Sequence, residues 1–128
     1  MAEMTIKKRP KNLDLTTIQL PLPGKVSILH RVSGAGLFLF LPVILWLFSA
    51  SLTSADTFAT FKSVFSSLPA KVVMAGLIWS FVHHACAGTR FLLLDMHIGI
   101  EKEEARKSAA VVLAVSIPLT LVLWGVLL

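Results

Sequence analysis

Three long segments of this 128-residue chain contain no charged residue, and they constrain its fold more than any other feature. The segments are Val32–Ala55, Val72–Thr89 and Ser108–Leu128. At about 1.5 Å per residue, helices of this length can cross the roughly 30 Å hydrocarbon layer of a bilayer. Three such helices leave no room for a separate soluble domain. The sequence therefore predicts an all-α integral membrane protein with three transmembrane helices, roughly Val26–Leu52, Ala70–Leu94 and Lys107–Leu128.

The net charge is +5, and the basic residues flank the apolar segments. Their distribution therefore indicates how the chain is oriented in the membrane. Six of the twelve Lys and Arg residues precede or begin the first helix: Lys7, Lys8, Arg9, Lys11, Lys25 and Arg31. Four lie at or beyond the end of the second helix, at Arg90, Lys102, Arg106 and Lys107, and only Lys62 and Lys71 lie on the other side. Because cytoplasmic loops of membrane proteins are rich in Lys and Arg, we expect residues 1–25 to form a cytoplasmic N-terminal arm and residues 26–128 a membrane domain. No nucleic-acid partner is expected, since the charges form no solvated basic face.

A polar stripe lies at the start of the first apolar segment. At helical spacing, Ser27, His30, Arg31 and Gly34 share one face. Polar groups at this depth must meet protein, water or a ligand, because lipid cannot satisfy them. The alternative is that His30 and Arg31 are interfacial anchors whose tips reach the lipid headgroups. Three polar groups on one stripe favour a binding site.

The connection between the first two membrane helices has a pattern of its own. Residues 49–69 are rich in Ser, Thr and Ala, with Phe58, Phe61 and Phe65 at near-helical spacing. This pattern predicts a short amphipathic helix at the membrane interface.

His84 lies inside the second membrane segment, on a stripe with Gly88, Phe91 and Asp95. It precedes Arg90 by about 9 Å along a helix, so it would lie in the cytoplasmic half of the membrane. Gly88, one turn away, leaves space beside the imidazole, as a flat macrocycle would require. Three interpretations stay open: a hydrogen bond between helices, a proton relay, or an axial ligand of a b-type haem.

The remaining reactive residues are less informative. Neighbouring residues on a helix point about 100° apart, so His83 cannot bind the same metal as His84. We expect His83 to pack or to form a hydrogen bond between helices, and His97 to lie in a solvated loop. Cys86 is the only cysteine, which excludes an internal disulfide and an iron–sulfur cluster bound by this chain alone. The chain has no Tyr, so a phenolic proton donor would have to come from a partner.

Two motifs give the sequence a specific resemblance. The first is Arg9-Pro10 followed by Ser27-x-x-His30-Arg31-x-Ser33, and the second is His84-x-x-x-Gly88-x-Arg90-Phe91-Leu92-x-x-Asp95. Their order and spacing resemble the membrane-anchor cytochrome b subunits of succinate dehydrogenase, respiratory complex II, over residues 7–128. The chain departs from the common pattern at Phe91, where many members have His, and at Leu94, where many have an aromatic residue or Met.

The resemblance implies a function and partners. A flavoprotein subunit oxidises succinate, an iron–sulfur subunit carries the electrons to the membrane, and ubiquinone is reduced there. The chain would be half of a haem-binding helical bundle, completed by a second three-helix anchor subunit in a bacterial inner membrane. His84 would be one axial ligand of haem b, and His30 and Arg31 would lie near the haem propionates. Ser27 and Arg31 would contribute to the ubiquinone site.

Three alternatives remain. The chain could be a small transporter or channel subunit in which Arg31 and His84 line a pathway. It could also be a purely structural anchor without redox function. Ser27, finally, could be an N-terminal helix cap and not a quinone ligand.

Overall fold

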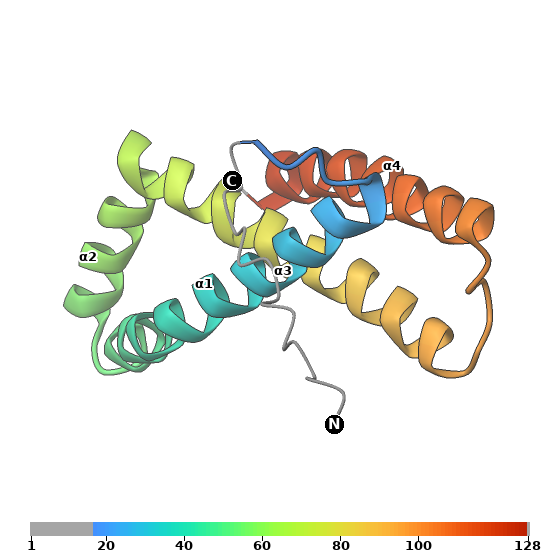
Figure 1. The fold of residues 1–128 in the computed structure, drawn as a ribbon. Helices are drawn as coiled ribbons and strands as arrows, with labels where there is room; N and C mark the ends of the chain where they lie inside the picture. The colour runs from blue at the N-terminus through green and yellow to red at the C-terminus, as the bar shows by residue number, and fades with distance from the viewer. Residues whose placement is uncertain (1–16, 128) are drawn as a thin grey trace, which may run out of the picture.

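The structure, a computed structural model, is described here for residues 17–127 and is built from four helices (Figure 1). They are α1 (Leu22–Ser51), α2 (Ala55–Ser66), α3 (Leu68–Asp95) and α4 (Lys102–Leu127). Helices α1, α3 and α4 are long and apolar enough to cross a membrane. The expected all-α integral membrane fold with three transmembrane helices is therefore confirmed. The proposed arm over residues 1–25 lies mostly outside the described residues and stays a prediction.

Two of the membrane helices begin earlier than the sequence pattern predicts, and proline is the reason. Helix α1 begins at Leu22 with Pro23 in its first turn, and α3 begins at Leu68 with Pro69 in its first turn. The sequence pattern predicts starts at Val26 and Ala70. Proline is tolerated in the first turn, where its missing N–H would have no helical partner, so Pro23 begins a helix and does not break one.

Helix α4 also begins early, at Lys102 and not at Lys107. Its first turn carries Glu103 and Glu104, whose negative charges favour a helix N-terminus. The turn that precedes it contains His97 and Gly99, both at positive φ. His97 is exposed in this turn, as expected.

Helix α2 is the short helix predicted within residues 49–69. Ser54 and Thr57 form a reciprocal capping box at its N-terminus. The ring of Phe61 lies 6.4 Å from that of Phe58 and 4.2 Å from that of Phe65, centroid to centroid. The three aromatic rings therefore form a continuous row along α2, with Phe58 at its exposed end.

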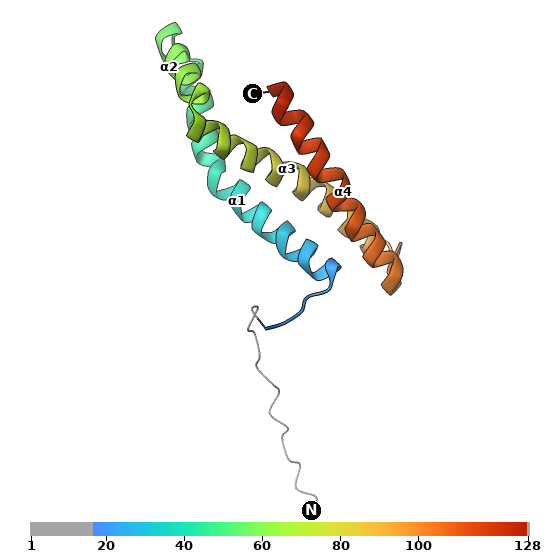
Figure 2. The ribbon, with the colours of Figure 1, turned by 90° about the horizontal axis from the view of Figure 1, so that it is seen from above.

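Helix α3 is the central helix, because it packs against both α1 and α4. Figures 1 and 2 show α1 and α4 running antiparallel to α3, with α4 diverging from α3 towards its C-terminus. The buried apolar cluster takes a residue from each membrane helix: Val26 of α1, Ala87 of α3, and Ala109 and Val112 of α4. Small side chains here let the backbones approach closely, as is usual between membrane helices. Large apolar residues elsewhere are exposed, such as Phe38 at 74% and Val126 at 77%, as expected of surfaces that meet lipid or a partner chain.

Candidate functional site

The imidazole of His84 on α3 faces α1, where it meets the first of the two sequence motifs. Its Nδ1 atom lies 3.0 Å from the backbone oxygen of His30 and 3.3 Å from the hydroxyl of Ser33. Ser33 itself donates to the same His30 oxygen at 2.9 Å. The sequence-predicted residues His30 and His84 are thus brought together across the α1–α3 interface.

These contacts determine which ring nitrogen of His84 carries the proton. A backbone oxygen can only accept a hydrogen bond, so a neutral His84 must hold its proton on Nδ1. The Nε2 atom then carries the free lone pair, and within residues 17–127 it has no hydrogen-bond partner. Histidines that ligate metals usually donate their other ring N–H to a carbonyl in this way. The donor set around His84 therefore fits a metal bound at Nε2.

The flat face of the His84 ring also packs against a neighbouring side chain. The His30 ring stacks on it with centroids 4.0 Å apart and an angle of 10° between the planes. The ring of Phe91 packs at an angle against the ring of His30, with the two centroids 5.1 Å apart. The Arg90 guanidinium lies over Phe91 at 5.5 Å. Together these contacts connect the imidazole to a larger packed cluster.

The glycine that makes space for the imidazole of His84 is Gly34, and the expectation that Gly88 leaves room for a flat macrocycle stays a prediction. A Cβ atom added to Gly34 would lie only 2.7 Å from Cε1 of His84. A Cβ atom at Gly88 would meet His30 Nε2 at an ordinary 3.6 Å and would not touch His84. Of these two glycines, only Gly34 is required by the close approach of the His84 imidazole, and a side chain at position 88 would make an ordinary contact with His30.

The predicted stripe on α1 divides between two environments. His30 and Gly34 face α3, whereas the side chain of Arg31 is exposed. Ser27 is half-buried in the second turn of α1, because the helix begins at Leu22. The capping position is occupied by Pro21, so the alternative that Ser27 is the helix cap is wrong.

His83 occupies a different environment from its neighbour His84. Its side chain is fully buried and stacks on Trp79, with centroids 5.1 Å apart and planes 21° from parallel. Neither ring nitrogen has a hydrogen-bond partner among the described residues. Of the two roles that we considered for His83, the structure supports packing.

Arg90 is a residue whose role the sequence pattern did not reveal. Its side chain is 6% exposed and points to α4, where Nε donates to Ser108 Oγ at 2.9 Å and Nη2 donates to the backbone oxygen of Ala105 at 3.1 Å. The guanidinium thereby joins the end of α3 to the start of α4. The available signal in the sequence was an Arg within the predicted range of the second membrane helix, but its partners on α4 depend on the α3–α4 turn.

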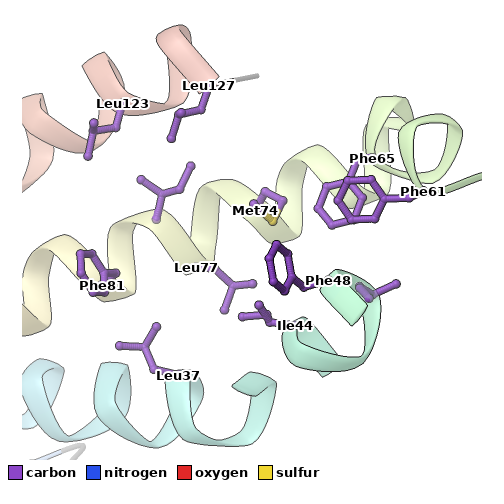
Figure 3. A pocket seen from close by; sticks show the side chains of 12 residues that line it. Leu37, Ile44, Phe48, Phe61, Phe65, Met74, Leu77, Phe81, Leu123 and Leu127 are labelled. Atoms are coloured by element: carbon purple, nitrogen blue, oxygen red, sulfur yellow. The ribbon is translucent and has the colours of Figure 1, made fainter. Parts of the chain in front are cut away.

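A separate apolar pocket of about 500 Å³ opens where α4 diverges from α3. Figure 3 shows Phe81 and Leu77 of α3, Leu37 of α1 and Leu123 of α4 around it, with the aromatic residues of α2 at its far end. Its lining is apolar throughout. Ligand sites for polar head groups need convergent donors or acceptors, and this lining supplies none. The surroundings of His30 and His84 are therefore the better candidate site.

Comparisons with known proteins agree with the motifs. A family model described as the succinate dehydrogenase/fumarate reductase transmembrane subunit matches residues 5–123. The chain is 33% identical over 119 residues to the succinate dehydrogenase cytochrome b556 subunit of Paracoccus denitrificans, covering 93% of this chain and 92% of that one. It is 34% identical over 120 residues to the Coxiella burnetii protein of the same name, covering 93% and 95%. The Rickettsia prowazekii protein of that name is 27% identical over 117 residues, covering 91% of each chain. Because the family model spans almost the whole sequence, the chain belongs to the family of succinate dehydrogenase/fumarate reductase transmembrane subunits.

Proposed function

We propose that this chain is a membrane-anchoring cytochrome b subunit of a succinate:ubiquinone oxidoreductase. In this role it binds haem b together with a partner subunit and forms part of the ubiquinone-reduction site. Its family and the names of its relatives support the succinate dehydrogenase assignment. The enzyme activity belongs to the complex, and this chain contributes the anchor and a share of the electron-transfer site.

The geometry of His84 is the observation that carries the haem proposal. The carbonyl of His30 fixes the proton on Nδ1, and Nε2 remains as a lone-pair donor. We infer that His84 is an axial ligand of the haem iron and that the second ligand comes from the partner. Bound haem supplies a centre that accepts and releases one electron at a time.

The polar residues of α1 can bind the negatively charged groups of a haem and of a quinone that is being reduced. We propose that His30 and Arg31 lie near the haem propionates, since guanidinium and carboxylate groups pair well through two parallel hydrogen bonds. Ser27 and Arg31, one helical turn apart, are proposed to contact ubiquinone. A hydroxyl can donate to a quinone carbonyl, and a nearby positive charge stabilises the negative charge that develops on reduction.

The proposed partners follow from the limits of a single chain. Three membrane helices do not enclose a haem, and His84 is the only axial ligand that we assign to this chain. The proposal therefore includes a second three-helix anchor subunit, an iron–sulfur subunit and a flavoprotein subunit. The excess of Lys and Arg at one end of the helices supports a bacterial inner-membrane location with a cytoplasmic N-terminus.

Replacement of His84 by Ala tests the ligand assignment, with His83→Ala as the matched control. The variants alter adjacent residues of one helix, but the ring of His84 has a 3.0 Å contact from Nδ1 to the backbone oxygen of His30, whereas that of His83 stacks on Trp79. We expect His84→Ala to lose or weaken the low-spin haem signal in reduced-minus-oxidised spectra of the purified complex, and His83→Ala to keep it. A bis-histidine spectrum that survives unchanged in His84→Ala would overturn the proposal.

The two alternatives make different predictions. A transport pathway needs polar groups through both halves of the membrane, but α4 has no ionisable residue beyond Lys107. A purely structural anchor would give a purified complex whose membrane subunits show no haem absorption. The same reduced-minus-oxidised spectrum therefore separates the redox subunit from the structural anchor.

A further inference from the structure

Ser33 is a buried serine whose hydroxyl contacts both the backbone oxygen of His30 and the imidazole of His84. It is 1% exposed, and its single proton is given to the backbone oxygen of His30 at 2.9 Å. Towards His84 Nδ1, at 3.3 Å, the hydroxyl can therefore offer only a lone pair. The Nδ1–H of His84 thus faces two acceptors, the His30 carbonyl and the Ser33 hydroxyl.

Gly34, the next residue of α1, lies against another side of the His84 ring. An added Cβ atom there would lie 2.7 Å from Cε1 and 3.1 Å from Nδ1 of His84. Contacts below 3.0 Å require something to shift, and the ring of His84 is the group that would move. The stacked His30 ring at 4.0 Å and the bond from Nδ1 already restrict its tilt and rotation. The missing side chain at Gly34 therefore helps to fix the orientation of the imidazole.

We propose that Ser33 and Gly34 are positioning residues that set the tautomer, orientation and basicity of the His84 imidazole, and thereby the reduction potential of the haem. This inference rests on the proposed function, because it assumes an iron bound at Nε2. Acceptors on the distal N–H raise the basicity of a histidine ligand. A more basic ligand stabilises the ferric state, so the Ser33 hydroxyl lowers the reduction potential.

Ser33→Ala in the intact purified complex is the first test, with Ser51→Ala as its matched control. Ser51 is also a buried serine of α1 that donates to the carbonyl three residues earlier, at 2.7 Å, but its partner is Phe48. We expect Ser33→Ala to raise the midpoint potential of the haem, to change its low-spin electron paramagnetic resonance g-values, and to weaken haem retention by about tenfold. Ser51→Ala should match the unmodified complex, and Ser33→Thr, which keeps the hydroxyl, should restore the potential.

Gly34→Ala tests the spatial constraint, and Gly36→Ala is its control. A Cβ atom at Gly36 meets nothing within 4 Å, whereas one at Gly34 collides with the ring. We expect Gly34→Ala to change the g-values or to release haem, and Gly36→Ala to do neither. Because both variants add the same methyl group to the same helix, a general effect on helix stability would change them equally.

The outcomes separate this inference from the proposed function. If His84→Ala keeps its haem signal, the ligand assignment itself fails. If His84→Ala loses the signal but Ser33→Ala and Gly34→Ala match their controls in potential, g-values and haem content, only the positioning roles fail. Equal loss of haem from Ser33→Ala and Ser51→Ala would also overturn the role of Ser33, because it would indicate a general packing effect. Loss from Ser33→Ala alone supports it.

Discussion

Arg90 and Ser108 connect two membrane helices through a hydrogen bond of 2.9 Å from the guanidinium Nε to the hydroxyl oxygen. The second bond from Arg90, to the backbone oxygen of Ala105, and the bond from Ser108 to that same oxygen at 3.2 Å close a small network. Because Arg90 also lies over Phe91, which packs against His30, this network extends from α4 to the histidine pair. The contacts that attach α4 to α3 are therefore connected to the histidine pair as well as stabilising the fold.

Arg90→Met should destabilise the complex more than Ser108→Ala, because it removes both bonds to α4. Hydrogen bonds between membrane helices contribute about 0.6 kcal/mol on average and up to about 1.7 kcal/mol. A double-mutant cycle on the free energy of unfolding in detergent should give a coupling energy in this range. Arg106→Met, at an exposed position of α4, is the control and should have little effect. Strictly additive effects of Arg90→Met and Ser108→Ala would contradict the network.

Ser27→Ala should slow ubiquinone reduction by succinate. A hydrogen bond to a group that acquires charge is worth about 1.5–3 kcal/mol, so we expect a loss of about tenfold or more. Succinate oxidation by a water-soluble artificial acceptor should be retained, because that acceptor does not need the membrane site. Equal loss in both assays would indicate failed assembly, and full activity in both would exclude a role for Ser27 in quinone reduction.

Arg31→Lys is a sharper test of the exposed guanidinium than Arg31→Ala. Lysine keeps the positive charge but cannot form two parallel hydrogen bonds with a carboxylate. If the proposed propionate contact depends on that geometry, Arg31→Lys should lose haem affinity and quinone reductase activity despite its charge. The opposite exchange at the exposed Lys25, Lys25→Arg, should change neither. Normal haem content and turnover in Arg31→Lys would show that the positive charge at this position is sufficient and that the paired hydrogen bonds are not needed.

The orientation in the membrane can be tested with reporter fusions. The distribution of Lys and Arg predicts that the C-terminus faces the periplasm. A reporter enzyme that is active only in the periplasm should therefore be active when fused after Leu128. The same reporter fused after Glu101, in the α3–α4 turn, should be inactive. The reverse pattern would invert the proposed topology.

Hydropathy and spacing were sufficient to predict the three membrane helices and the short helix α2. These features depend on periodicity within one segment, which the sequence displays directly. The first-turn positions of Pro23 and Pro69 were not predicted, because a proline that starts a helix and one that breaks it look alike in sequence.

The identity of the glycine beside His84 could not be predicted for a different reason. Gly88 shares a helix with His84, and sequence spacing gives only neighbours on the same helix. Gly34 lies on another helix, and its contact with the ring depends on how α1 crosses α3. The partners of Arg90 likewise depend on the turn between α3 and α4, which fixes which residues of α4 come opposite α3.

The contacts of His84 and of Arg90 divide the membrane helices into two separate pairings. The hydrogen bond from His84 joins α3 to α1 across 54 positions of the sequence, and the bond from Arg90 joins α3 to α4 across 18. Because α3 contributes a residue to both, one helix carries the histidine contact towards α1 and the attachment of α4. A change in the tilt or rotation of α3 would therefore disturb both neighbours at once, whereas a change confined to α4 would leave both partners of the histidine contact in place.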